Sequence, residues 1–175
     1  MIHFETNLGR FTIELYEKEA PITVANFLKY IDEGFFDGTT FHRIVPGFVI
    51  QGGGFTEDMS QKRTNPTIKN EADNGLKNTR GSLSMARTND INSATSQFFV
   101  NLKDNEFLDH SRGNFGYAVF GRVTEGMDVI DKIAAVKTGR RHGHDDVPLE
   151  AVTMTRVQRA AKTTEKKTEK KTDKK

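Results

Sequence analysis

One arginine lies inside an otherwise apolar run at residues 41–54, FHRIVPGFVIQGGG, and this feature constrains the fold more than any other. The guanidinium of Arg43 is not deprotonated in proteins, so its charge needs a physical reason. It either joins an ion pair, reaches the surface along its aliphatic stem, or faces a cleft where a substrate meets it. No carboxylate lies within the run, so an ion pair inside it is excluded. A surface position and a cleft position remain equally supported explanations for the charge.

The second half of this run predicts a β-strand. Side chains of a strand over 48–51 alternate between its faces with a period of two, which places Phe48 and Ile50 on one face and Val49 and Gln51 on the other. The three glycines at 52–54 then allow the backbone to turn or to approach a neighbour closely.

The rest of the folded part predicts many strands and two helices. Alternation predicts a hairpin over 2–15, with its turn at 7–10. Apolar residues at helical spacing predict one helix from Pro21 to Gly34 and another over 127–136. The remaining β-like runs are Thr40–Ile44, Phe48–Gly52, Leu83–Ala86, Gln97–Asn101, Ala118–Val123 and Leu149–Val157. This pattern is typical of a mainly β fold, a closed antiparallel sheet with helical caps.

Composition excludes several classes of protein. The chain has no cysteine, so disulfides, thiolate nucleophiles and Cys-ligated zinc are absent. No run of eighteen apolar residues occurs, and the N-terminus lacks the features of a signal peptide, so we expect a cytoplasmic protein and no membrane contact. Thirteen phenylalanines supply bulky core material for one domain of 175 residues.

The C-terminal segment differs from the rest. Residues 162–175 hold seven lysines and three acidic residues in a four-residue repeat without an apolar side chain. We therefore expect a folded domain over 1–158 and a disordered, Lys-rich tail over 159–175. The tail serves either solubility, which its composition favours, or weak contact with polyanions such as RNA.

Other candidate sites carry weaker signals. His142 and His144 stand two apart in a charged, Gly-containing segment, which favours a solvated turn over a metal site. His42 precedes Arg43, and because neighbouring strand residues face opposite sides, a structural role is favoured over acid–base chemistry. Ser93 and Ser96 have no evident His and Asp partners for a hydrolase triad.

Five segments of the chain resemble the cyclophilin family of peptidyl-prolyl isomerases, closest to its short bacterial cytoplasmic type. They are FHRIVPGFVIQGGG at 41–54, GSLSMAR at 81–87, SATSQFFV at 93–100, NEFLD at 105–109 and YAVFGRV at 117–123. The resemblance covers residues 1–158. It implies a closed eight-stranded antiparallel barrel with one helix over each end, whose packed interior leaves the site in a groove on the flank.

The resemblance also implies site residues. Those matching the catalytic positions are Arg43, Phe48 and Gln51. Those matching the substrate-binding positions are Val49, Ala86, Arg87, Gln97, Phe99, Phe107, Leu108 and Tyr117. Four of them depart from common family residues: Val49 replaces Met, Arg87 replaces Asn, Phe107 replaces Trp and Tyr117 replaces His. Since Phe107 lacks the indole donor, we expect weak binding of cyclosporin-type ligands.

The expected function is prolyl isomerisation that assists protein folding. The enzyme would act on X-Pro bonds of unfolded or flexible polypeptides, as a monomer, without a covalent step, a cofactor or a metal. Two alternatives from other classes stay open. One is a noncatalytic module that binds proline peptides in the same groove, and the other is a holdase whose active surface lies elsewhere. Intact Arg43 and Gln51 favour the enzyme.

Overall fold

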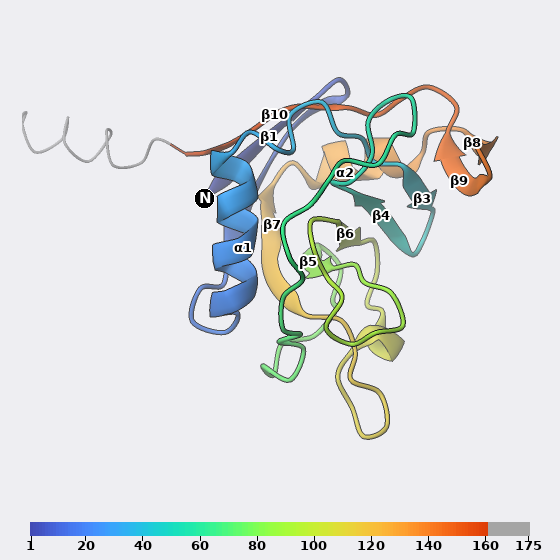
Figure 1. The fold of residues 1–175 in the computed structure, drawn as a ribbon. Coiled ribbons are helices and arrows are strands. Elements are labelled where there is room, and N and C mark those ends of the chain that lie inside the picture. The colour runs from blue at the N-terminus through green and yellow to red at the C-terminus, as the bar shows by residue number, and fades with distance from the viewer. Residues whose placement is uncertain (161–175) are drawn as a thin grey trace, which may run out of the picture.

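The computed structural model describes residues 1–160, so the tail predicted over 159–175 lies outside the described residues from 161 onward. One antiparallel sheet of eight strands, in the order β10-β1-β2-β7-β5-β6-β4-β3, curves around the core (Figure 1). Its strands are β1 (Ile2–Thr6), β2 (Gly9–Leu15), β3 (Arg43–Val45), β4 (Val49–Gly52), β5 (Ser82–Met85), β6 (Phe98–Asn101), β7 (Val119–Glu125) and β10 (Met154–Arg159).

Two helices cover the sheet, and both were predicted. Helix α1 (Pro21–Asp32) packs against β10, and α2 (Met127–Ala134) packs against β2, β3 and β4 (Figure 1). A short 3₁₀ helix (Glu106–Leu108) precedes β7. No helix within residues 1–160 is both long and apolar enough to cross a membrane.

The barrel is not strictly closed, which corrects the prediction. The sheet ends at β3 on one side and at β10 on the other. The gap is spanned by the segment before β3, where Thr40 pairs with Thr153 and the Phe41 N–H donates to the Val152 carbonyl at 2.9 Å. A single isolated bridge does not make a continuous ladder, so the two edge strands meet through their flanking segments.

The interior of the sheet is filled by aromatic side chains. The seven phenylalanines at its centre are fully buried: Phe4, Phe11, Phe27, Phe36, Phe41, Phe98 and Phe120. Phe98 makes edge-to-face contacts with Phe27 and Phe36 at centroid distances of 5.4 and 5.6 Å. Because these rings occupy the barrel interior, a substrate must bind on its outside.

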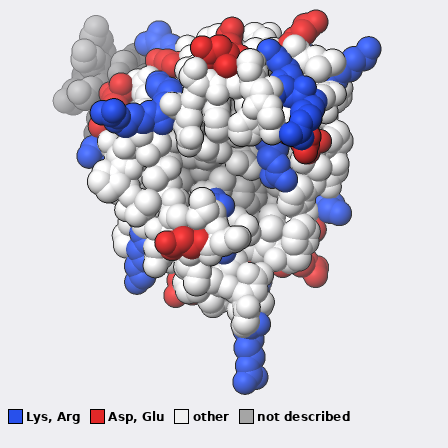
Figure 2. Space-filling view, turned by 45° about the vertical axis from the view of Figure 1, so that its right-hand side comes forward, with Lys and Arg blue, Asp and Glu red and all other residues white. Residues whose placement is uncertain are grey.

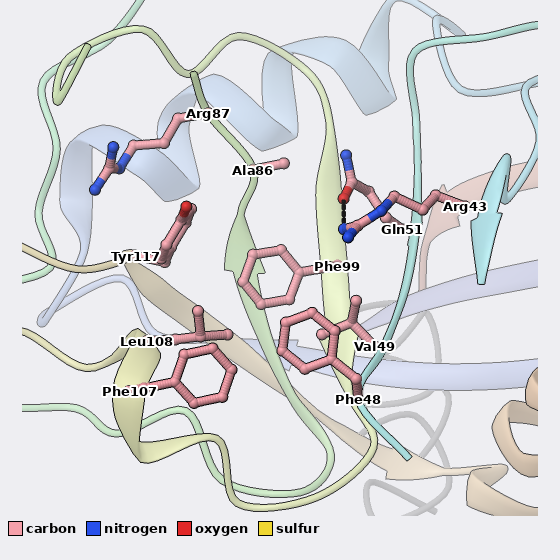
Figure 3. Close-up of a pocket in the computed structure, with 10 residues that line it drawn as sticks. All are labelled: Arg43, Phe48, Val49, Gln51, Ala86, Arg87, Phe99, Phe107, Leu108 and Tyr117. Atoms are coloured by element: carbon pink, nitrogen blue, oxygen red, sulfur yellow. Dashed lines mark hydrogen bonds between the residues drawn. The ribbon is translucent and has the colours of Figure 1, made fainter. Parts of the chain in front are cut away.

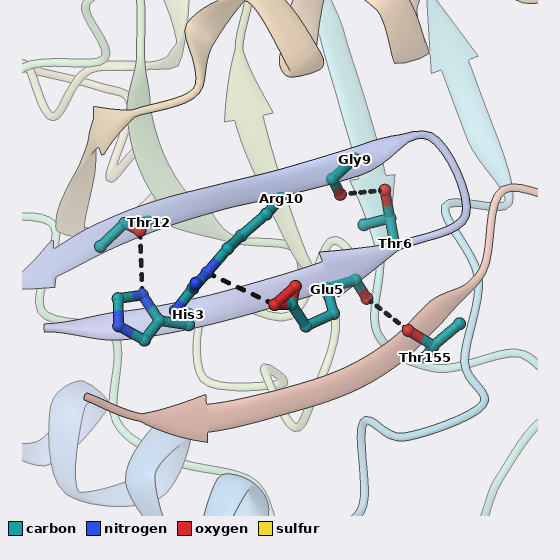
Figure 4. A network of polar contacts seen from close by, with 7 residues as sticks. All are labelled: His3, Glu5, Thr6, Gly9, Arg10, Thr12 and Thr155. Carbon is teal, nitrogen blue, oxygen red and sulfur yellow. Dashed lines mark hydrogen bonds and ion pairs between the residues drawn. The ribbon is translucent and has the colours of Figure 1, made fainter. Parts of the chain in front are cut away.

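The outer face of the β1–β2 hairpin is polar, as the alternation of its sequence predicts (Figure 4). His3 lies opposite Thr12, and its Nδ1 is 2.9 Å from the Thr12 hydroxyl. Glu5 lies opposite Arg10 in an exposed ion pair of 3.4 Å. The Thr155 hydroxyl of β10 donates to the Glu5 carbonyl at 3.1 Å, which adds a side-chain link between strands.

Sequence patterns missed one hairpin and misplaced two other features. The solvated turn expected around 142–146 is present at 142–143, but its flanks form a hairpin that was not predicted, with strands β8 (Thr138–Arg141) and β9 (His144–Pro148). Its charged residues hide the strand pattern because most of them face solvent. The last strand begins at Met154 instead of Leu149. Phe48 does not share the buried face of Ile50, because it lies in the turn before β4, where alternation does not yet apply.

Candidate active site

The candidate site lies on the outer face of β4 and β6. Alternate residues of these strands point in opposite directions, so Ile50 and Phe98 enter the core while Val49 and Phe99 face outward. The outward residues form a second apolar cluster with Leu108, separate from the barrel interior. The floor of the groove is therefore formed by the outward-facing side chains of the same strands whose inward-facing side chains fill the core.

A cavity of about 270 Å³ opens over this cluster. It is lined by ten residues, Arg43, Phe48, Val49, Gln51, Ala86, Arg87, Phe99, Phe107, Leu108 and Tyr117, which are drawn in Figure 3. All ten belong to the eleven predicted from sequence. The eleventh, Gln97, is absent from the cavity lining and contacts the site through Gln51.

A chain of polar side chains holds the arginine of the site. Arg43 and Gln51 are direct partners in the β3–β4 register, and Arg43 Nη1 donates to Gln51 Oε1 at 3.2 Å (Figure 3). Gln51 Nε2 in turn donates to Gln97 Oε1 at 3.0 Å. None of the ion pairs among residues 1–160 includes Arg43, so the guanidinium is oriented by a neutral amide and not by a carboxylate. Of the three explanations for its charge, the structure supports the cleft.

The glycine run makes room for this chain of amides. A Cβ on Gly54 would lie 2.6 Å from Gln97 Cγ, and a Cβ on Gly52 would lie 2.5 Å from the Thr40 carbonyl oxygen. Gly53 has a φ of +95°, in the region that favours glycine. The close approach expected of residues 52–54 is thus confirmed.

The other end of the cavity is apolar. Phe99 and Tyr117 meet edge to face with a centroid distance of 5.7 Å, and Leu108 packs beside them. Phe48 and Phe107 stack at 5.5 Å with an interplanar angle of 18°. The Phe107 side chain is the outermost of these, because the residue is 64% exposed. Rigid aromatic walls of this kind suit a small apolar ring.

Sequence reasoning missed the residues that fix the loop carrying Phe107 and Leu108. Asn105 is buried, and its Nδ2 donates to the Phe48 carbonyl at 3.0 Å and to Asn101 Oδ1 at 2.8 Å. The Asn78 N–H donates to Asp109 Oδ1 at 2.6 Å on the other side of the loop. The available signal was the density of asparagines in this part of the chain, since buried amides need partners.

His42 lies outside the cavity. The residue is 6% exposed, and its ring lies against Phe55 in a tilted arrangement, with a centroid distance of 4.4 Å and an interplanar angle of 44°. Burial, together with the nearby His144 and Arg43, lowers the pKa of His42 to about 4. The imidazole is therefore neutral at pH 7, and its placement agrees with a structural role. Within the described part of the chain, no three His, Cys, Asp or Glu side chains gather as metal ligands would.

Comparison with known proteins gives a consistent result. Residues 1–159 match the family model described as cyclophilin type peptidyl-prolyl cis-trans isomerase/CLD. The chain is 56% identical to peptidyl-prolyl cis-trans isomerase cyp18 of Streptomyces antibioticus, over 87% of this chain and 94% of that protein. It is 54% identical to peptidyl-prolyl cis-trans isomerase B of Escherichia coli strain K12, over 90% and 98%.

A solved structure supports the same fold. The cyclophilin type isomerase of Cryptosporidium parvum, determined in the presence of the dipeptide Ala-Pro, superposes with a TM-score of 0.77. The match covers 91% of this chain and 98% of that one at 24% identity, so it speaks for the fold alone. With the family match over nearly all described residues and the identities above half, this chain belongs to the cyclophilin type peptidyl-prolyl cis-trans isomerase family.

Proposed function

We propose that the Arg43 groove is the place where this chain performs the prolyl isomerisation of its family. One observation carries the proposal: a guanidinium held by a neutral amide, with no carboxylate partner among residues 1–160, stands beside a rigid apolar pocket. A cation and an apolar pocket side by side suit a proline ring and the amide nitrogen that belongs to it.

The chemistry of the peptide bond explains why one donor suffices. Rotation must cross roughly 18 to 20 kcal/mol because twisting removes amide resonance. In the twisted state the prolyl nitrogen regains a localised lone pair, which accepts a hydrogen bond that the planar amide nitrogen cannot accept. An N–H of Arg43 aimed at that nitrogen therefore binds the transition state more strongly than either isomer. No covalent bond forms or breaks.

The remaining residues divide into four proposed roles. Phe48, Phe99 and Leu108 hold the ring while the preceding carbonyl turns, and they exclude water, which strengthens the contact of Arg43. Gln51 keeps the guanidinium in position, and Ala86 with Gln97 forms the rim along which the peptide backbone lies. Val49, Phe107 and Tyr117 complete the pocket wall.

The position of the groove also bears on its clients. A cavity on the outer face of the sheet takes a proline only where the client chain is exposed and extended. We therefore propose flexible or unfolded polypeptides as substrates. The cysteine-free sequence is compatible with a reducing compartment, and we propose the cytoplasm as the location.

The test is a protease-coupled assay with the tetrapeptide anilide Ala-Ala-Pro-Phe. Chymotrypsin cleaves only the trans form, so an isomerase shortens the slow phase of the reaction in proportion to its concentration. Uncatalysed exchange takes tens to hundreds of seconds, which leaves a wide window for detection. Saturable binding of the peptide without any acceleration of the slow phase would contradict the proposal and support the noncatalytic binding module instead.

A further inference from the structure

A second arginine, Arg87, follows β5 in the chain and lines the cavity, and several contacts hold its side chain in place. Its Nε and Nη2 both donate to the Gly116 carbonyl, at 3.2 and 3.0 Å, and its Nη1 donates to the Thr88 carbonyl at 2.9 Å. The guanidinium carbon also lies 4.5 Å from the centroid of the Tyr117 ring. A side chain fixed by three hydrogen bonds and a cation–π contact has little conformational entropy left to lose when a ligand arrives.

The charge of Arg87 is not neutralised by any of these contacts. Its hydrogen-bond acceptors are the backbone carbonyls of Gly116 and Thr88. The ion pairs among residues 1–160 are all on the exposed surface, and none includes Arg87 or Arg43. The cavity lining holds these two cations and neither Asp nor Glu. The lining of the groove therefore carries positive charge from two arginines and contains no acidic side chain.

The two arginines stand on opposite sides of the pocket. Figure 3 shows the Arg43 guanidinium beside Gln51 on one side of the pocket and the Arg87 guanidinium next to Tyr117 on the other, pointing away from Arg43, with Ala86 and Phe99 between the two side chains. In the space-filling view this face is hollow at its centre, and cationic atoms reach into the hollow (Figure 2). A peptide whose proline lies between the arginines advances about 3.3 Å per residue. Because Arg87 lines the same cavity of about 270 Å³ as Phe99 and Tyr117, we expect side chains within two residues of a bound proline to lie near it.

We propose that Arg87 makes the groove selective for prolines that have an acidic residue within two positions. This inference rests on the proposed function, since it concerns the substrates of the same groove. Arg43 is engaged with Gln51 and the prolyl nitrogen, while Arg87 keeps donors free for a carboxylate: three of the five N–H groups of its guanidinium are used. Lysine at the same peptide positions is disfavoured by both arginines.

The size of the preference follows from the exposure of the site. Fully exposed ion pairs contribute little, and a half-buried, pre-oriented guanidinium contributes more. We expect kcat/KM for a Glu peptide to exceed that for the matching Gln peptide by about three- to tenfold at low salt. The preference should shrink in 0.5 M salt, where the Debye length is only a few ångströms.

The experiment uses two peptide series, Ala-X-Pro-Phe and X-Ala-Pro-Phe anilides, with X as Glu, Gln or Lys. The protease acts at the same Phe in every peptide, so the series differ only in the charge near proline. Wild type is compared with Arg87→Gln and with Arg10→Gln. The second variant removes an equal charge from the outer face of the β1–β2 hairpin. The Glu-to-Gln ratio is taken within each variant, so that a general loss of activity cancels.

The expected result is a ratio of three or more for wild type and Arg10→Gln in at least one series, and a ratio near one for Arg87→Gln. A wild-type ratio near one in both series, or a ratio that Arg87→Gln leaves unchanged, would overturn the inference. The wild-type ratio needs no variant, so a ratio near one overturns the inference even where Arg87→Gln does not fold. Absence of catalysis with every peptide, Gln peptides included, would instead refute the proposed function itself.

Discussion

The two faces of β4 and β6 belong to different parts of the molecule, the packed core and the open groove. Ile50, Phe98 and Val100 point inward and are fully buried among aromatic rings. Phe99, one residue from Phe98, points outward into the groove beside Tyr117. The inner face is complete without a ligand, whereas the outer face ends in an open cavity. Stability and activity are thus assigned to alternate residues of the same strands.

This arrangement explains how a filled barrel provides a binding site. The rigid core fixes the backbone of both strands, and the backbone in turn fixes the outward side chains to a small range of positions. Preorganisation of that kind is what stabilisation of a transition state requires. The comparison also predicts that substitutions on the two faces have separable effects.

The largest effect is expected from Phe98→Ala. Truncating a fully buried phenylalanine removes contacts with its neighbouring rings and leaves a cavity, which costs about 3 to 5 kcal/mol in the free energy of unfolding. Urea denaturation measures this loss. Phe99→Ala is the matched control: it should cost less stability and reduce kcat/KM for the tetrapeptide. Equal destabilisation by both substitutions would show that the two faces are not separable.

His42 lies where the buried interior meets the groove. Its side chain is buried, whereas the side chain of the next residue, Arg43, faces the groove. The folded pKa of His42 is about 4, against 6.5 for the free side chain. Below pH 6.5 the unfolded chain binds a proton that the folded chain does not, so stability falls as the pH decreases from 6.5 to 4. At 1.36 kcal/mol for each pKa unit, the loss approaches about 3 kcal/mol.

Denaturation of wild type and of His42→Leu, at several pH values between 4 and 7.5, measures this effect. Leucine is similar in volume and does not titrate, so the difference in slope isolates His42 from the carboxylates. Parallel slopes for the two proteins would contradict the account.

The isomerase rate of wild type should stay nearly flat from about pH 6 to 9, because no titrating group takes part in the proposed reaction.

The smallest effect is expected from Gln51→Ala. This change removes the acceptor that orients Arg43 and leaves Gln97 without its donor. Hydrogen bonds to charged groups contribute about 1.5 to 3 kcal/mol, so kcat should fall by at least about tenfold. KM and the melting temperature should change little, since the pocket for the ring and the core remain. A raised KM at constant kcat would assign Gln51 to substrate binding instead.

Local sequence patterns predicted the elements that repeat regularly. Alternation predicted the β1–β2 hairpin and the opposite orientations of Ile50 and Val49, and helical spacing predicted α1 and α2. The patterns failed at Phe48 and over β8–β9, where a turn and a run of charged residues interrupt the period. They also predicted a strictly closed sheet, whereas the two edge strands meet only through an isolated bridge between Thr40 and Thr153, residues far apart in the chain.

The site itself was predicted through family motifs and not through patterns. The motifs named the residues that line the cavity, yet they gave no account of what holds those residues there. The support comes from distant partners such as Asn78 with Asp109, and from Asn105, whose Nδ2 donates to the Phe48 carbonyl at 3.0 Å. Hydrogen bonds between residues tens of positions apart leave no local trace in a sequence.

The most direct test of the account is the activity of Arg43→Ala beside that of Arg10→Ala. Loss of one preorganised donor to the transition state predicts a fall in kcat/KM of two to three decades, about 2.7 to 4 kcal/mol, for Arg43→Ala alone. Its melting temperature should match that of wild type, because a cation facing the groove does not support the core. Full activity in a folded Arg43→Ala protein would contradict the proposed mechanism and leave the groove as a binding site only.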